Sequence, residues 1–176
     1  MANFIPAVNQ LVSSLALGGQ IIVAVLLLAV VLRGKDNGSV EFVEKHAIKL
    51  IFAISLGAVL VSLFYSSVAG FDPCFLCWWQ RIFMYSICVI SGLAVFKKDD
   101  SILDYLIALA LFGGLIALYH VYLEYGGVAI IPCSADAAAS CTQRFIYEYN
   151  YITIPVMSLT GFAMIGTILG IKKANG

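Results

Sequence analysis

The chain has 176 residues, of which 62% are hydrophobic and 11% are charged, and its formal net charge at pH 7 is zero. So few charged side chains cannot cover the surface of a water-soluble domain of this length, and nothing in the charge balance suggests a nucleic-acid partner. The composition instead predicts an integral membrane protein surrounded by the lipid bilayer.

Five apolar runs are each long enough to cross the hydrocarbon core of a bilayer, which takes about 20 helical residues. We place these runs near residues 12–32, 48–69, 78–96, 102–123 and 152–171. No soluble domain, long linker or repeat separates them. The pattern therefore predicts an all-α, polytopic membrane protein with a single membrane domain over residues 1–176.

The first run, 12–32, has two interpretations. A secretory signal peptide carries basic residues before its apolar run and a small-residue cleavage site after it, and this sequence shows neither. A retained helix with its N-terminus outside fits better. Because the run contains no ionisable group, we expect an anchor or a lipid-facing packing helix.

The connection at 33–47 mixes acidic and basic side chains around an Asn-Gly turn signal. Ser39 and Val40 are suited to open a short amphipathic helix along the inner membrane surface. His46 lies in this segment without a second histidine or cysteine at metal-binding spacing, so we interpret it as a solvated side chain.

Basic residues gather at alternate connections. Eight of the ten lysines and arginines lie beside three of them: Arg33, Lys35, Lys45, Lys49, Lys97, Lys98, Lys172 and Lys173. By the positive-inside rule these segments are cytoplasmic, which places the C-terminus inside and the N-terminus outside. The loops at 70–77 and 124–151 are then external, and thiols on that side can form lasting disulfides.

The most informative stretch, residues 71–81, reads FDPCFLCWWQR. Asp72 is a good helix N-cap and Pro73 suits the first helical position, so we expect a helix to begin here. Cys74 and Cys77 then lie in its first turns. Because the positive end of the helix dipole stabilises a thiolate, the sequence predicts a dithiol with one nucleophilic sulfur.

Arg81 stands on the same helical face as the two cysteines. An arginine near the membrane boundary either snorkels to the headgroups or belongs to a site, and its position beside a dithiol favours the site. Trp78 and Trp79 fit an interfacial aromatic belt. Cys88, deeper in the bilayer with no cation beside it, is expected to act as a small apolar residue.

The run at 102–123 returns to the outer face and ends among tyrosines. It carries His120 and Glu124 at i and i+4, on one face. His120 is expected at about the depth of Arg81. A solvated position in the aromatic belt and a place in the site are equally compatible with this pattern.

The next external loop contains Cys133 and Cys141 with seven residues between them. This spacing allows a small closed loop but suits a zinc knuckle poorly. Four outer cysteines permit two alternatives to redox chemistry: a structural metal site, or static disulfides that pin the loops of a non-catalytic membrane scaffold.

The order Cys-x-x-Cys-x-x-x-Arg at the head of a transmembrane helix, followed by a cysteine pair in the next external loop, resembles the DsbB family of disulfide bond formation proteins. The likeness covers about residues 48–171, which would form the family's four-helix bundle core. It leaves 12–32 as an extra N-terminal transmembrane helix. The related vitamin K epoxide reductase family has its loop pair before the Cys-x-x-Cys, so the order here disfavours it.

The resemblance implies that Cys74–Cys77 is a redox-active disulfide next to a membrane quinone, ubiquinone or menaquinone, with no metal cofactor. Cys77 would face the quinone ring, and Arg81, together with His120, would stabilise negative charge on the quinone oxygens. Gln80 stands where some members of the family carry an acidic residue.

The resemblance also implies that Cys133–Cys141 is a second redox disulfide. Cys133 would form the mixed disulfide with a DsbA-like, thioredoxin-fold dithiol oxidase, and Cys141 would bond across the loops to Cys74. The implied protein is a thiol:quinone oxidoreductase of the bacterial cytoplasmic membrane with its cysteines on the outer face, which is the system that keeps the periplasm oxidising.

Overall fold

A computed structural model describes residues 4–33, 38–98, 101–129 and 141–175, and within them the chain is helical with no strand. Its helices are α1 (Phe4–Arg33), α2 (Gly38–Lys45), α3 (Ala47–Ser67), α4 (Phe75–Lys97), α5 (Leu103–Glu124) and α6 (Ile154–Asn175). All except α2 are long and apolar enough to cross a membrane. The predicted all-α, multi-pass architecture is therefore confirmed.

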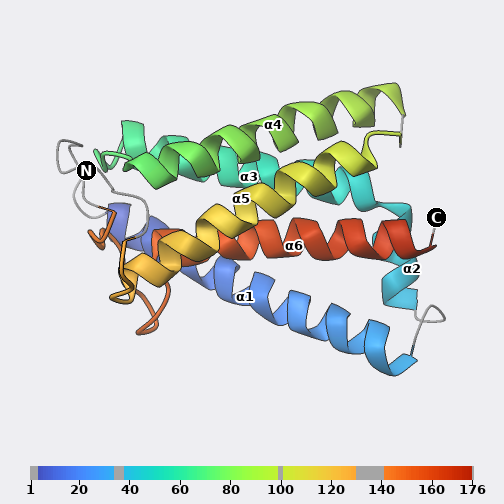
Figure 1. Ribbon diagram of the computed structural model, residues 1–176, viewed down its shortest axis with the longest axis horizontal. Coiled ribbons are helices and arrows are strands. Elements are labelled where there is room, and N and C mark those ends of the chain that lie inside the picture. The colour runs from blue at the N-terminus through green and yellow to red at the C-terminus, as the bar shows by residue number, and fades with distance from the viewer. Residues whose placement is uncertain (1–3, 34–37, 99–100, 130–140, 176) are drawn as a thin grey trace.

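Helices α3 to α6 pack into a bundle in which each contacts its neighbours, and α6 closes the ring by contacting both α5 and α3. Helix α1 lies against α6 and diverges from the bundle toward its own C-terminal end (Figure 1). We call the end where α4 begins and α5 ends the cysteine end, and the opposite end the lysine end.

The short helix α2 at the lysine end agrees with the amphipathic segment expected there (Figure 1). Val40 and Val43 are buried, whereas Phe42 is exposed beside the charged side chains of the same helix. A helix with one apolar and one charged face is suited to lie along the membrane surface.

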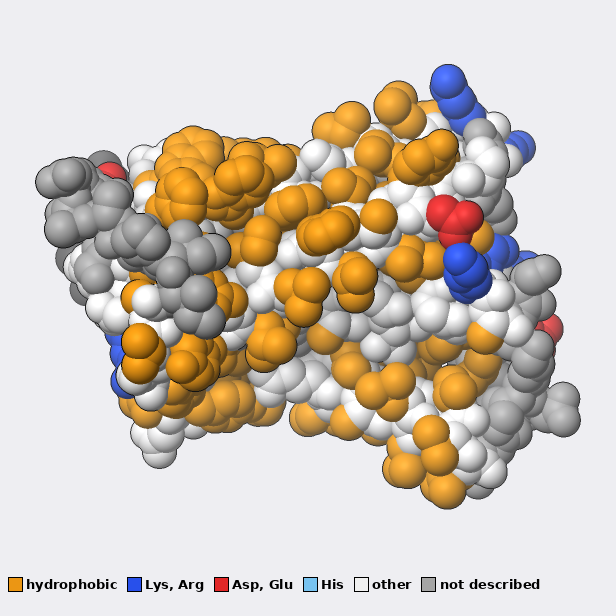
Figure 2. Space-filling view, viewed as in Figure 1, with side chains coloured by type: hydrophobic (Ala, Val, Ile, Leu, Met, Phe, Trp, Pro, Cys, Tyr) orange, Lys and Arg blue, Asp and Glu red, His pale blue; other side chains and the backbone are white. Residues whose placement is uncertain are grey.

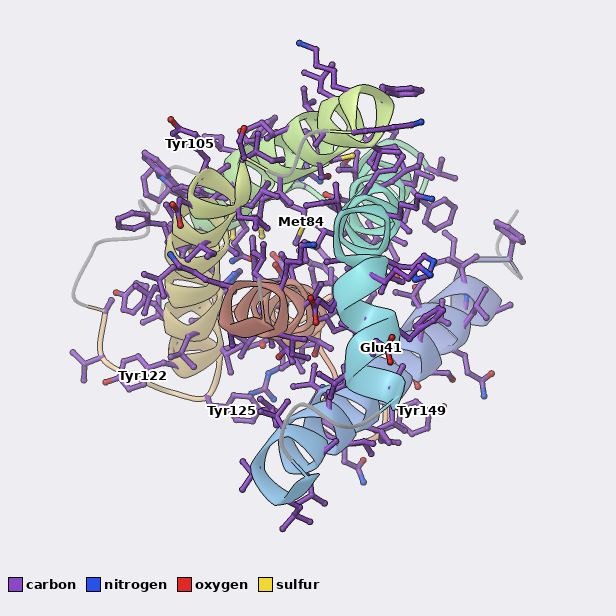
Figure 3. The ribbon with its side chains drawn as sticks, turned by 90° about the vertical axis from the view of Figure 1, so that its right-hand side faces the viewer. Glu41, Met84, Tyr105, Tyr122, Tyr125 and Tyr149 are labelled. Atoms are coloured by element: carbon purple, nitrogen blue, oxygen red, sulfur yellow. The ribbon has the colours of Figure 1, made fainter. Side chains whose placement is uncertain are left out.

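The interior of the bundle is an apolar core. Leu106 of α5, Ile87 of α4 and Ile165 of α6 have no exposed surface. Figure 3, a view along the bundle, shows Met84 among the helices and Tyr105 at the periphery. Charged side chains lie at the two ends of the molecule, and apolar side chains cover the side between them (Figure 2).

Helices α4, α5 and α6 meet closely at Gly113. A Cβ atom added to this glycine would lie too close to the ring of Phe162 and 3.0 Å from the Cβ of Phe83. Small residues at helix interfaces allow the close approach on which packing in membranes depends. Gly113 therefore brings α5, which carries His120, against α4, which carries the cysteine pair.

Two predicted boundaries were wrong. Helix α1 begins at Phe4, eight residues before the expected start, because the uncharged segment preceding residue 12 continues the helix. Helix α4 begins at Phe75, and its N-cap is Cys74 in place of Asp72. The Cys74 sulfur accepts the backbone N–H of Cys77 at 3.4 Å and so supplies the capping acceptor itself.

Helix α1 is more than the apolar anchor that its composition suggested. The Gln20 side chain donates to Thr160 Oγ1 of α6 at 3.1 Å and accepts from Tyr151 Oη at 2.7 Å. Ser14 and Tyr149 share a hydroxyl–hydroxyl bond of 2.8 Å. These contacts tie α1 both to α6 and to the segment that precedes α6.

Candidate active site

The dithiol lies at the cysteine end of the bundle, where α4 begins. The sulfur atoms of Cys74 and Cys77 are 2.9 Å apart, and neither cysteine is in a disulfide. Cys74 is buried, with 3% of its surface exposed, whereas Cys77 is half-buried. The two thiols are close enough to interconvert with a disulfide through a small movement of one side chain.

His120, near the end of α5, links three parts of the site. Its Nε2 lies 3.7 Å from the Cys74 sulfur and 3.1 Å from the carbonyl oxygen of Cys141, and its Nδ1 lies 2.9 Å from Gln80 Nε2. An amide nitrogen donates and a carbonyl oxygen accepts, so Nδ1 is the acceptor and Nε2 carries the hydrogen. The ring therefore directs an N–H toward Cys141 and the Cys74 sulfur.

The surroundings of Cys74 favour its thiolate. The hydrogen bond from the Cys77 thiol and the nearby His120 ring lower the pKa of Cys74 to about 4, although burial opposes them. The sequence predicts one nucleophilic sulfur in this pair, and the mechanism implied by the resemblance makes Cys77 the better leaving group if its pKa is low. The structure assigns the lowered pKa to Cys74, the N-cap of α4.

Arg81 lies at the seam between α3 and α4. Its Nε donates to Ser62 Oγ at 2.8 Å, and its Nη2 donates to the Ser62 carbonyl at 3.0 Å. The guanidinium carbon is 5.3 Å from the centre of the Trp78 ring, within cation–π distance. Arg81 is half-buried and held by α3, so it does not simply extend to the headgroups.

Cys141 belongs to the same cluster as the helix pair. It is buried and disulfide-bonded, and it packs with Cys74, Leu76 and Leu123. A loop sulfur and a helix sulfur thus share one apolar pocket despite their distance in the sequence. Cys133, the other predicted loop cysteine, lies outside the described residues.

The Cys74, Cys77 and His120 ligand atoms all lie within 4.8 Å of one another, which raises the question of a metal. Two thiolates on a tetrahedral zinc would be roughly 3.8 Å apart, given Zn–S bonds of about 2.3 Å. The observed sulfur–sulfur distance of 2.9 Å is much shorter. The group is therefore not a clear metal site, and its geometry suits thiol–disulfide chemistry better.

The remaining residues that the sequence singled out on α4 lie near this cluster or farther along the helix. Trp78 and Trp79 are exposed near the start of α4, as residues of an aromatic belt would be. Cys88 is a half-buried free thiol farther along α4. The bond between Gln80 and His120 was not predicted, although an amide six residues after Cys74 in an apolar helix is a signal that it bonds inside the protein.

Comparison with known proteins decides the family. The model of the family described as disulfide bond formation protein DsbB matches residues 44–171, which include the helix pair, Arg81, His120 and the loop pair. The chain belongs to the DsbB family. The matched segment excludes α1 and most of α2.

Relatives with similar names match most of the chain. It is 36% identical over 122 residues to a probable disulfide formation protein C 1 of Bacillus anthracis, covering 69% of this chain and 88% of that protein. It is 36% identical over 137 residues to disulfide bond formation protein C of Bacillus subtilis, covering 74% and 97%. For a probable disulfide formation protein of Chlamydia pneumoniae, the identity is 33% over 135 residues, covering 76% and 96%. No solved structure matches the chain.

Proposed function

We propose that this DsbB-family protein is a thiol:quinone oxidoreductase of the bacterial cytoplasmic membrane. It would reoxidise a DsbA-like, thioredoxin-fold dithiol oxidase on the outer face and pass the electrons to a membrane quinone. One observation carries the proposal: disulfide-bonded Cys141 packs against Cys74, whose sulfur is 2.9 Å from that of Cys77. Such an arrangement supports disulfide exchange between the loop cysteines and the helix cysteines.

The first half of the proposed reaction exchanges disulfides between the partner and the loop. A thiolate of the partner attacks the loop disulfide at Cys133, and the partner's second thiol resolves the mixed disulfide. The partner is oxidised by two electrons, and Cys133 and Cys141 become thiols. This step keeps the number of disulfides constant.

The second half exchanges disulfides between the loop and the helix. The Cys141 thiolate attacks the Cys74 sulfur of the Cys74–Cys77 disulfide and releases Cys77 as a thiolate. Cys133 then attacks Cys141 and releases Cys74, whose lowered pKa makes it a good leaving group. The loop disulfide is restored, and the helix pair holds two electrons.

The residues around Cys77 fit a quinone. Arg81 has five N–H donors, of which two are bound to Ser62, and its guanidinium lies beside the Trp78 ring at a half-buried position. A quinone bound there would take two electrons from the helix pair, one proton from the Cys77 thiol and one from water, and would leave as quinol. Arg81 would hold the quinone oxygen and stabilise the negative charge that develops there.

The direct test is quinone reduction by the purified protein in the presence of a reduced thioredoxin-fold oxidase, followed by the absorbance of the quinone. We expect turnover with the wild-type protein and its loss in Cys77→Ser. Cys88→Ser, which changes a cysteine of the same helix outside the cluster, is the matched control. Turnover by Cys77→Ser at the wild-type rate, or none by the wild-type protein, would contradict the proposal.

A further inference from the structure

Glu124 is a buried carboxylate that the proposed reaction does not use. It ends α5, and 1% of its side chain is exposed. Its Oε2 accepts a 2.6 Å hydrogen bond from Thr153 Oγ1, and its Oε1 lies 3.8 Å from Nε of Arg144. A carboxylate is costly to bury even when it is paired and hydrogen-bonded, so its presence here suggests a role in fixing one arrangement of the chain.

The partners of Glu124 lie on both sides of the segment that follows Cys141. Arg144 also donates to the backbone carbonyl of Glu124 at 2.8 Å, and its guanidinium lies 5.2 Å from the rings of both Tyr125 and Tyr147. Thr153 immediately precedes α6 and is fully buried. Glu124 thus holds the segment 141–153, which we call the cysteine arm, near its beginning and at its end.

The residues of the arm that contact α5 are spaced along the chain like the residues of α5 that they contact. Glu124 lies one helical turn beyond His120 on the same face of α5. Arg144 lies three residues beyond Cys141, whose carbonyl contacts His120. The two contacts, His120 with Cys141 and Glu124 with Arg144, therefore run side by side and set the position of the cysteine arm along α5.

We infer that Glu124 is a positioning residue that docks the cysteine arm so that Cys141 stays within reach of Cys74. The inference rests on the proposed function, because the exchange between Cys141 and Cys74 is the step that docking would accelerate. Glu124 contacts none of the reacting sulfur atoms. It raises the effective concentration of the Cys141 thiol at the Cys74 sulfur.

The test measures this effective concentration without quinone or partner protein. In a variant carrying Cys77→Ser, Cys88→Ala and Cys133→Ser, only Cys74 and Cys141 remain as cysteines. This variant is equilibrated with mixtures of reduced and oxidised glutathione, and the equilibrium gives the stability of the Cys74–Cys141 disulfide. When that disulfide forms, oxidised glutathione takes up the two electrons and two protons. The disulfide-bonded fraction is read by alkylation of the free thiols and mass spectrometry.

Adding Glu124→Ala to this background should lower the effective concentration by about tenfold or more, since Thr153 and the Arg144 charge then lose the carboxylate that they contact. Glu124→Gln keeps an acceptor for Thr153 and should restore most of the effect. Asp104→Ala is the matched control, because it removes an exposed ion pair with Lys173 at the lysine end of the same helix. It should leave the effective concentration unchanged.

An unchanged value in folded Glu124→Ala, or an equal loss in Asp104→Ala, would overturn the inference. If Glu124→Ala does not yield folded protein, Thr153→Val decides by the same criterion, because it removes a donor to the carboxylate and leaves the charge pair in place. Since no quinone enters the measurement, its outcome is independent of whether the purified protein reduces quinone.

Discussion

The cysteine end and the middle of the bundle use buried polar side chains in different ways. At the cysteine end, Gln80, His120 and Glu124 each bond to a group on another element. In the middle, the buried hydroxyls of Ser55 and Ser91 bond to carbonyls of their own helices. Hydrogen bonds within one helix satisfy a polar group, whereas those between elements also fix the elements relative to each other.

This difference in hydrogen bonding indicates that the reactive groups of this membrane protein lie at the cysteine end. Intramembrane polar groups are costly unless they are paired, so a concentration of them around two thiols indicates a role beyond packing. The apolar middle holds the helices together, and the cysteine end orients reactive atoms. Substitutions in the two regions should therefore have different effects, which the following experiments measure.

The largest expected effect concerns the ionisation of Cys74. With a pKa of about 4, the thiol stays ionised as the pH falls from 9 to 5 and becomes protonated only near pH 4. Between pH 8 and pH 5 the rate at which iodoacetamide alkylates Cys74 in the reduced protein should therefore stay nearly constant, whereas that of a thiol with the ordinary pKa of about 8.5 falls about tenfold per pH unit. Mass spectrometry of the alkylated site gives the pH profile.

Two substitutions separate the causes of this profile. Cys77→Ala removes the larger of the two lowering effects and should move the reactivity of Cys74 to higher pH. His120→Ala removes the smaller and should move it less. A profile that is the same in all three proteins would show that the neighbours of Cys74 do not set its ionisation.

Arg81→His should weaken the use of quinone mainly through its apparent affinity. A hydrogen bond to a charged group contributes about 1.5–3 kcal/mol, so the apparent KM for quinone should rise about 10- to 100-fold. The dependence of the initial rate on quinone concentration gives this value. A wild-type dependence would remove Arg81 from the quinone site.

In the apolar core away from the cysteine end, Leu106→Ala should lower the stability of the protein without moving the pH profile of Cys74. Leu106 is fully buried, and the cavity left by such a change costs on the order of 2 kcal/mol. Leu111→Ala, at a lipid-exposed position of the same helix, is the control and should cost less. Unfolding in a mild detergent by added denaturing detergent compares the two.

The smallest effect is expected for Cys88→Ala. Cys88 lies about three helical turns beyond Cys77, the last residue of the cysteine cluster on α4, so turnover with quinone should stay within about twofold of the wild-type rate. A large loss of turnover in folded protein would show that the chemistry extends along α4 into the middle of the bundle.

The sequence by itself determined the five membrane-spanning helices, the short helix at the lysine end and the family. These features follow from local information: hydropathy over a window of about 20 residues, an amphipathic pattern, and the order and spacing of cysteines. Cys74 and Cys77 also had to lie close together, because three residues on one helix make nearly one turn.

Only the tertiary structure decided which groups from distant segments meet. Several contacts depend on how each helix is rotated about its axis. They are the hydrogen bonds of His120 with Gln80 and Cys141, of Gln20 with Thr160 of α6, and of Arg81 with Ser62. The tertiary structure also decided that Cys74, and not Asp72, caps α4. Rotation and loop docking are set by the summed packing of many side chains, so no local pattern in the sequence specifies them.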